Sequence, residues 1–324
     1  MNDIINWGII GCGDVCEVKS GPAFSKVPNS RLVAVMRRDG DKAKDYAQRH
    51  GVSKYYDQVE ALIKDEQVNA IYIATPPSFH EEYLELALQA GKPVYVEKPV
   101  TTGVASCQRM IAVEKESGLK VAVAHYRRSL DMFIQVKKLV DDGAVGKIKL
   151  VLLKMLQPVS SKIITQTPDN WRVNPAISGG GLFHDLSPHQ LDILYWIFGE
   201  PGDTTVFAYN QGGYYPAPDN VSVQAIFQGD IQFNAVWNFN VAENAATDQC
   251  EIIGDKGSIR FGFFRQGIIE FETNEGKEIF THEFPAHIQQ PHIARVVQYF
   301  LGNDSNPCSL TEALATMRII EKGV

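Results

Sequence analysis

A carboxylate and an imidazole stand four residues apart in the sequence GGGLFHDLSPHQLD, which covers residues 179–192. In a helix, Asp185 and His189 would project from one face, because residues four apart lie one turn from each other. Histidine titrates near neutral pH and a neighbouring carboxylate can fix its tautomer, so the pair suits proton transfer. A half-buried structural histidine beside an exposed aspartate would have the same spacing, and the rest of the chain must decide between these interpretations.

A second candidate site is a glycine turn near the N-terminus. Gly11 and Gly13 follow an apolar run and precede Asp14 and Val15, which open a helical pattern. In this context the first glycine makes a tight turn, and the second lets backbone N–H groups reach a pyrophosphate at a helix N-terminus. Cys16 occupies the third position of the pattern in place of Gly or Ala, which loosens helix–strand packing without excluding it. The pattern favours a dinucleotide site over an ordinary strand–turn–helix junction.

The residues after the second apolar run indicate which dinucleotide binds. An NAD site places an acidic residue about 20 positions after the glycines to bind the ribose 2′-hydroxyl, whereas this chain has Arg37 and Arg38 there. Guanidinium groups bind a 2′-phosphate through charge-assisted hydrogen bonds, and Arg38 could instead stack on the adenine. The competing interpretation is that both arginines are solvated on the surface and that Asp39 or Asp41 binds the ribose. The sequence predicts NADP(H) in preference to NAD(H).

The elements that must position these residues alternate in the first part of the chain. Short apolar runs are followed by helical patterns, and Gly51, Gly91 and Gly118 stand just past expected helix ends. Such alternation is typical of βαβ units with a parallel sheet. We expect strands at 4–10, 31–36, 70–74, 94–96 and 120–124 and helices at 41–50, 57–64, 79–90 and 104–116.

The pattern changes after about residue 125. A helix is expected at 129–142 and a strand at 147–156, followed by an irregular stretch at 157–178 and then the helix of Asp185 and His189. Later strands are separated by turn signals such as Asp-Lys-Gly at 255–257, which predict antiparallel hairpins in an α+β domain. These strands are expected at 204–209, 221–227, 231–239, 249–253, 258–263, 267–272 and 277–282, with closing helices at 288–301 and 310–321.

Size and composition restrict the classes of partner. The chain has 324 residues, enough for two domains, and a formal net charge of −7 without a basic run, so nucleic acid and anionic membrane are poor partners. The N-terminus lacks a signal-peptide pattern and no apolar run approaches membrane-spanning length. The five cysteines lack the spacing of metal ligands. We therefore expect no metal, and reduced thiols in a cytoplasmic protein.

Several motifs together resemble one known family. They are GIIGCG at 8–13, ATPP at 74–77 with His80, GKPVYVEKP at 91–99, GAVGK at 143–147, WR at 171–172, the glycine-rich stretch 179–192 and GDKGS at 254–258. The chain resembles the Gfo/Idh/MocA oxidoreductases, typified by glucose–fructose oxidoreductase and inositol dehydrogenase. The resemblance covers nearly the whole chain, and the Glu-Lys-Pro and Gly-Gly-Gly…Asp-x-x-x-His motifs are specific only in combination.

The resemblance implies an α/β Rossmann domain at 1–125 and an α+β domain with a large, mostly antiparallel sheet at 126–324. The last helix is able to pack back on the first domain. Family members transfer hydride between a nicotinamide and a secondary alcohol or ketone, most often of a sugar or cyclitol. They usually associate as homodimers or homotetramers through the open face of the second sheet, so a small polyol or sugar substrate and a homo-oligomer are expected here.

The resemblance also implies roles for individual residues. Lys98 matches the catalytic lysine of the family, Asp185 its carboxylate and His189 its usual acid/base. Lys98 follows a buried strand, and open α/β sheets bind ligands beyond the carboxyl ends of their strands. A lysine beside an oxidised, cationic nicotinamide would have a lowered pKa, and it could hydrogen-bond the reacting oxygen.

Further residues match the surroundings of the cofactor and substrate. Glu97 and Pro99 match residues that shape the nicotinamide pocket, and the loop near the cofactor is matched by Thr75, Pro76 and His80. Residues that border the substrate are expected at the domain junction and on the irregular stretch 157–178. For the residues on that stretch, the alternative is a structural role as a packed anchor of the loop. The residues expected to border the substrate are Tyr126, Arg127, Trp171 and Arg172.

Two rival functions remain open at the level of sequence. A nicotinamide-dependent glycosidase of the same family would oxidise a sugar transiently, eliminate the aglycone and reduce the product again, with no net redox change. The Arg37–Arg38 pair argues against it, because those relatives tend to use NAD. A non-catalytic dinucleotide sensor is the second rival, and the presence of Lys98, Asp185 and His189 argues against it, since a sensor needs no proton-transfer groups.

Overall fold

The structure, a computed structural model, describes residues 4–161, 163, 170–264 and 267–324. The chain forms two compact units: Met1–Arg127 with Pro285–Leu314, and Arg128–Phe284 with Ala315–Val324. The expected domain ranges, 1–125 and 126–324, differ from these units chiefly in the stretch 285–314, which belongs to the first unit. No helix in the described part of the chain has the length and apolar character needed to cross a membrane.

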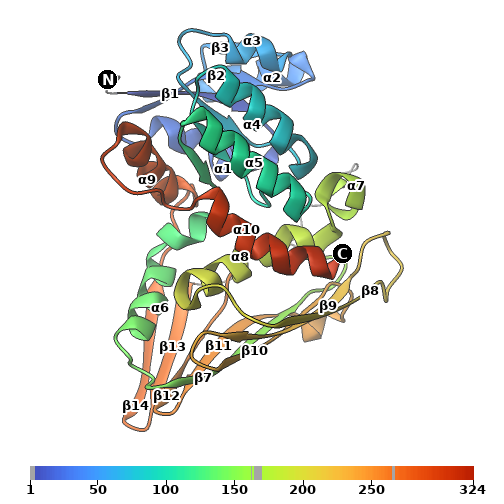
Figure 1. Cartoon of the computed structure of the whole chain (residues 1–324), viewed down its shortest axis with the longest axis vertical. Helices are drawn as coiled ribbons and strands as arrows, with labels where there is room; N and C mark the ends of the chain where they lie inside the picture. The colour runs from blue at the N-terminus through green and yellow to red at the C-terminus, as the bar shows by residue number, and fades with distance from the viewer. Residues whose placement is uncertain (1–3, 162, 164–169, 265–266) are drawn as a thin grey trace. The chain divides into compact units, whose positions relative to one another are not determined.

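The first unit contains a six-stranded sheet in the order β3-β2-β1-β4-β5-β6, in which every pairing is parallel (Figure 1). Its central strands are buried apolar runs, as strands covered on both faces must be. The edge strand β3 has a charged and half-exposed sequence, and the sequence pattern missed it. The strands are β1 Ile5–Ile10, β2 Ser30–Met36, β3 Lys54–Tyr56, β4 Ala70–Ile73, β5 Val94–Val96 and β6 Val121–Val123.

The helices of this unit begin and end close to the expected residues. Gly51 and Gly118 adopt the left-handed conformation, with φ of 66° and 65°, and end their helices as predicted. The first helix is short because a 3₁₀ turn at Gly21–Ser25, with proline in its first turn, follows it. The α-helices are α1 Asp14–Val18, α2 Gly40–His50, α3 Val59–Ile63, α4 His80–Gln89, α5 Val104–Ser117 and α9 Gln290–Leu301.

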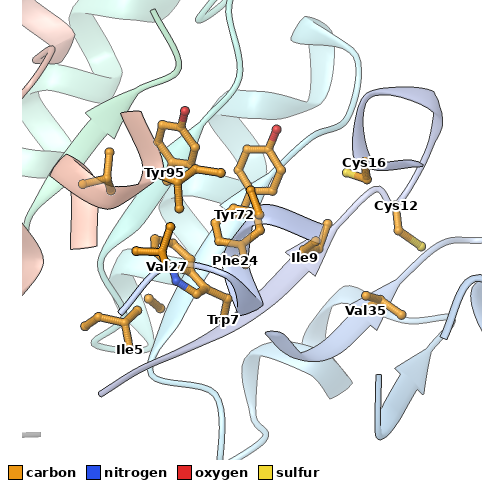
Figure 2. Close-up of a cluster of buried hydrophobic side chains, with 14 of the residues drawn as sticks. Ile5, Trp7, Ile9, Cys12, Cys16, Phe24, Val27, Val35, Tyr72 and Tyr95 are labelled. Carbon is orange, nitrogen blue, oxygen red and sulfur yellow. The ribbon is translucent and has the colours of Figure 1, made fainter. Parts of the chain in front are cut away.

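An aromatic cluster fills the core on one side of this sheet (Figure 2). The rings of Trp7 and Phe24 lie 4.9 Å apart between centroids, and those of Tyr72 and Tyr95 stack at 5.1 Å. Helix α9 adds three buried aliphatic side chains to the same cluster, namely Ile293, Val296 and Val297. Burial of this apolar face is the physical reason why the stretch 285–314 belongs with the first unit.

The second unit contains an eight-stranded sheet in the order β14-β13-β12-β11-β7-β10-β9-β8. The pairing of β7 with β10 is parallel and every other pairing is antiparallel, so the sheet is mostly antiparallel rather than a series of hairpins alone. The long connection through the helix of Asp185 leads to β8, and the antiparallel pairings β8–β9 and β9–β10 then bring β10 alongside β7 in the same direction. The strands are β7 Ile148–Leu156, β8 Thr204–Tyr209, β9 Asn220–Phe227, β10 Ile231–Asn238, β11 Thr247–Gly254, β12 Gly257–Phe261, β13 Gly267–Thr273 and β14 Gly276–His282.

Helices cover one face of this sheet. Helix α6, Asp131–Asp141, contacts β12 through Phe133, whose ring centroid lies 6.2 Å from that of Phe261. Helix α8, Gly181–Phe198, contacts β10 through Phe183, whose ring lies 5.1 Å from that of Trp237. The indole N–H of Trp237 donates to Oε1 of Gln190 at 2.9 Å, which fixes the rotation of α8 over the sheet. Shorter or boundary-crossing helices are α7 Pro175–Ser178 and α10 Leu310–Ile320.

Candidate active site

The glycine turn lies at the carboxyl end of β1, beside the segment that follows β4. Gly11 has a φ of 90°, and a Cβ at this position would lie 2.7 Å from Cγ2 of Thr75. The N–H of Gly13 donates to the carbonyl of Gly11 at 2.7 Å, and Gly13 is the N-cap of α1, followed by Asp14 and Val15. Only glycine meets both the conformational and the spatial requirement at Gly11. The turn therefore fits a site at which the protein backbone closely approaches the pyrophosphate of a dinucleotide.

His80 ties two strand-end segments together. Its Nε2 lies 2.8 Å from the carbonyl oxygen of Thr75 and its Nδ1 3.1 Å from that of Val100. The ring is fully buried, and burial lowers the pKa of His80 to about 4. The ring thus holds the Thr75–Pro76 loop and the segment that follows Lys98, and a direct contact between His80 and a cofactor stays a prediction.

Glu97 and Lys98 come directly after β5. The Glu97 side chain is 6% exposed, and its Oε1 accepts hydrogen bonds from Tyr72 Oη and Gln289 Nε2, each at 2.6 Å. Its Oε2 accepts the backbone N–H of Lys98 at 3.2 Å. The Lys98 side chain is half-buried at the end of the parallel sheet, where ligands of such sheets bind.

The cationic segment after β2 also lies at this edge of the sheet. The guanidinium of Arg38 lies 5.0 Å from the centroid of the Phe79 ring, and the N–H of Arg37 donates to the carbonyl of Tyr56 at 3.2 Å. Asp39 is the N-cap of α2, and its Oδ1 accepts the N–H of Lys42 at 3.1 Å. This hydrogen bond and the Lys42 ammonium lower the pKa of Asp39, whose carboxylate is thereby engaged in the cap.

In the second unit, the irregular stretch before α7 meets the first turns of α8. Nε of Arg172 lies 3.3 Å from Oδ2 of Asp185, and both side chains are 15% exposed. The guanidinium of Arg172 also lies 4.6 Å from the centroid of the Trp171 ring. One turn further along α8, His189 is buried and its ring contacts the ring of Phe264 edge-on at 5.5 Å. The structure therefore joins three of the predicted residues, Trp171, Arg172 and Asp185, in one cluster.

The remaining predicted residues are divided between the two units. Lys98 belongs to the first unit, whereas Asp185 and His189 belong to the second, so their action on one substrate stays a prediction. Tyr126 and Arg127 are buried residues at the end of the first stretch of unit one, with the guanidinium 5.4 Å from the tyrosine ring.

Sequence reasoning missed a buried ion pair next to the predicted helix site. Nε of Arg128 donates to Oδ2 of Asp192 at 2.9 Å, and Nη2 donates to Oδ1 at 2.7 Å, with both side chains almost fully buried. Asp192 ends the glycine-rich stretch, three residues after His189. No local pattern in the sequence indicates that Arg128 pairs with an aspartate 64 residues away.

Comparison with known proteins identifies the family. Residues 5–125 match the model described as "Oxidoreductase family, NAD-binding Rossmann fold", and residues 133–260 match the "GFO/IDH/MocA C-terminal domain". The chain belongs to the Gfo/Idh/MocA oxidoreductases. It is therefore an oxidoreductase with an NAD(P)-binding Rossmann domain, as the resemblance in the sequence implied.

Individual members of the family are similar over different lengths. Oxidoreductase P35 of Formosa agariphila is 43% identical over 321 residues, covering 99% of this chain and 98% of that protein. A dTDP-3,4-didehydro-2,6-dideoxy-alpha-D-glucose 3-reductase of Streptomyces violaceoruber is 28% identical, covering 74% and 71%. The crystal structure of an aldose-aldose oxidoreductase from Caulobacter crescentus has the same fold, with a TM-score of 0.85 at 23% identity, covering 98% of this chain and 96% of that one.

Proposed function

We propose that this oxidoreductase is a dehydrogenase or reductase that uses NADP(H) and acts on a secondary alcohol or ketone of a sugar, cyclitol or related polyol. The observation that carries the substrate class is the cluster of Trp171, Arg172 and Asp185. An aromatic ring can cover the apolar face of a sugar, while a guanidinium and a carboxylate can bind its hydroxyl groups. The relative from Streptomyces violaceoruber, a 3-reductase of a dTDP-linked didehydro-dideoxy-glucose, supports a keto-sugar substrate.

The preference for NADP(H) rests on the charges after β2. Arg37 and Arg38 supply two cations at the position where NAD sites carry an acid. Asp39, the carboxylate that follows these arginines in the sequence, is engaged as the N-cap of α2, so a role at the ribose would compete with that cap. Arg38 and the Phe79 ring offer a platform on which adenine can stack.

In the proposed reaction, the substrate hydroxyl gives its proton to His189 as hydride leaves the carbon. Bound nicotinamide supplies the hydride acceptor in this direction and the donor in the reverse one. Lys98 donates a hydrogen bond to the reacting oxygen and stabilises negative charge on it. Asp185 orients His189 or binds an adjacent hydroxyl, and its pairing with Arg172 holds the carboxylate in place.

We further propose a cytoplasmic homodimer or homotetramer assembled through the second sheet. Phe207, Tyr209 and Ile226 are exposed apolar side chains on β8 and β9. Phe207 pairs with Ser222 and Tyr209 with Asn220 in the ladder, so these side chains share one face, opposite the buried inner face. The five cysteines are buried and are not disulfide-bonded, which agrees with a reducing compartment.

The deciding experiment begins with titration of the purified protein with NADPH and NADH, followed through nicotinamide fluorescence. We expect NADPH to bind at least about tenfold more tightly, and sugars, inositols and ketoses then to be oxidised or reduced with net change in the nicotinamide. Release of an aglycone without net redox change would instead indicate the glycosidase, and binding without turnover of any substrate in this panel would indicate the sensor. Binding of neither dinucleotide would contradict the proposal altogether.

A further inference from the structure

Gln289, at the start of α9, forms hydrogen bonds to three other residues that are distant in the sequence and belong to the first unit. Its Nε2 donates to Oε1 of Glu97 at 2.6 Å, and its Oε1 accepts the hydroxyl of Tyr95 at 3.0 Å. Its backbone N–H donates to the carbonyl of Lys19, just after α1, at 3.1 Å. The side chain is fully buried. One residue therefore joins α9 to the end of β5 and to the helix that follows the glycine turn.

The Glu97 carboxylate depends on these donors. A buried carboxylate is stable only when hydrogen bonds replace its lost water, and Tyr72, Gln289 and the N–H of Lys98 supply them. Burial, with the charge of Glu97 nearby, raises the pKa of Tyr72 well above its usual range, so the phenol remains a donor at neutral pH. Oε2 of the same carboxylate fixes the backbone of Lys98.

An amide suits this position for a chemical reason. The side chain must donate to a carboxylate and accept from a phenol at the same time, and glutamine does both without charge. A methionine would fill similar volume but would leave Glu97 one donor short. A glutamate would set a second carboxylate against Glu97, and the two would have to share a proton.

We propose that Gln289 is a positioning residue for Lys98: it holds the Glu97 carboxylate in the orientation that fixes the Lys98 backbone at the end of β5. This inference rests on the proposed catalytic role of Lys98, and it adds a residue 191 positions away in the sequence that acts through Glu97. The hydrogen bond from Gln289 to Lys19 links the same residue to the end of α1, the helix that follows the glycine turn.

The first test compares Gln289→Met with Gln298→Met. Gln298 lies on the same helix, and its Oε1 accepts a local hydrogen bond from Nδ2 of Asn303 at 3.0 Å. We expect Gln289→Met to speed hydrogen exchange of the Lys98 amide by about 10- to 100-fold, the effect of losing a hydrogen bond to a charged group, and to lower kcat more than it raises KM. Gln298→Met should match wild type in both measurements. A purely structural role would instead speed exchange throughout α9 and the sheet without singling out Lys98.

The second test uses Gln289→Glu and the pH profile. At low pH the introduced carboxyl is protonated and can donate to Glu97, so kcat should approach the wild-type value. As the pH rises and the two carboxyl groups lose the proton that they share, kcat should fall below the wild-type value. Gln289→Met should lack this recovery. Tyr95→Phe removes only the hydroxyl that orients the Gln289 amide, and it should speed Lys98 exchange about threefold even where Gln289→Met fails to fold.

The inference would be overturned if the Lys98 amide exchanged at the wild-type rate in both Gln289→Met and Tyr95→Phe. It would also be overturned if Gln289→Glu had the same pH profile of kcat as wild type. Lys98→Met separates this result from the larger proposal. If that variant keeps full turnover, the catalytic role of Lys98 fails, whereas the exchange measurement still reports whether Gln289 orders the segment.

Discussion

Nε of Arg172 lies 3.3 Å from Oδ2 of Asp185, which joins the irregular stretch before α7 to the helix that carries His189. Both side chains are half-buried, so the pair is shielded from solvent more than a surface ion pair is. An exposed ion pair typically adds no more than about 1 kcal/mol to stability. The guanidinium also covers the Trp171 ring. A packed loop anchor and a substrate-binding group are therefore compatible roles for Arg172.

Replacement of Arg172 tests whether this cluster binds substrate. We expect Arg172→Met to raise KM for the sugar by about 10- to 100-fold, because a charge-assisted bond to a ligand contributes about 1.5–3 kcal/mol, with unchanged affinity for NADPH. Steady-state kinetics and fluorescence titration measure the two quantities. Arg318→Met, which removes an exposed pair with Glu200 in the same unit, is the matched control. Equal KM in both variants would leave Arg172 as a loop anchor only.

The proton-transfer assignment is tested by His189→Asn. We expect kcat to fall by about 10²- to 10⁴-fold, the usual contribution of a general acid–base group, while the affinity for NADPH and the melting temperature stay near wild type. His50→Asn, which alters a pair with Glu17 on the other unit, should keep normal turnover. A loss of less than about threefold in His189→Asn would assign the proton transfer to another group.

Cofactor preference is tested at the two arginines after β2. If Arg37 or Arg38 binds a 2′-phosphate, then Arg37→Met or Arg38→Met should weaken NADPH binding by about 10- to 100-fold and leave NADH binding nearly unchanged. Arg31→Met, an exposed change at the start of the same strand, should affect neither. Equal weakening of both cofactors by Arg38→Met would mean that this residue stacks on adenine over Phe79 and does not select the phosphate.

His80 should make stability depend on pH. Burial lowers its pKa from 6.5 to about 4, so between these values the unfolded chain binds a proton that the folded chain does not. The free energy of unfolding contributed by neutral His80 is therefore complete above pH 6.5 and declines as the pH falls toward 4, by up to about 3 kcal/mol. Other titrating groups are shared with a His80→Gln variant and cancel in the difference.

Unfolding of wild type and His80→Gln should therefore be compared at several pH values. The stability gap between them should narrow as the pH falls from 7 to 4. A gap that is constant with pH would mean that His80 titrates normally in the folded chain.

The buried pair of Arg128 and Asp192 should matter for stability more than any exposed pair. Arg128→Met leaves the Asp192 carboxylate buried without its bidentate partner, and we expect destabilisation of about 3–5 kcal/mol. Arg128→Met combined with Asp192→Leu should recover much of this loss, because two apolar groups need no charge compensation. Thermal unfolding measures both, with Arg318→Met expected within about 0.5 kcal/mol of wild type. Failure of the double variant to recover would indicate a further role for Asp192.

Local sequence patterns predicted most elements correctly because local physics determines them. The strand at 204–209 was predicted with its observed bounds, and Gly51 and Gly118 end their helices through left-handed conformations that glycine adopts without steric cost. The short edge strand β3 was missed, because a three-residue strand with an exposed tyrosine carries no apolar periodicity. The parallel pairing of β7 with β10 was also missed, because strand partners depend on contacts between distant residues.

By itself, the sequence determined the family, the two sheets and the chemistry-bearing motifs, since each of these is written in short stretches of neighbouring residues. Only the tertiary structure decided which polar side chains are partners. Gln289 lies 192 residues from Glu97, and Arg128 lies 64 residues from Asp192, yet each pair is buried and hydrogen-bonded. Such pairs form because a polar group that packing removes from water is stable only when it is hydrogen-bonded within the protein. No local spacing along the chain encodes which distant residue will be the partner.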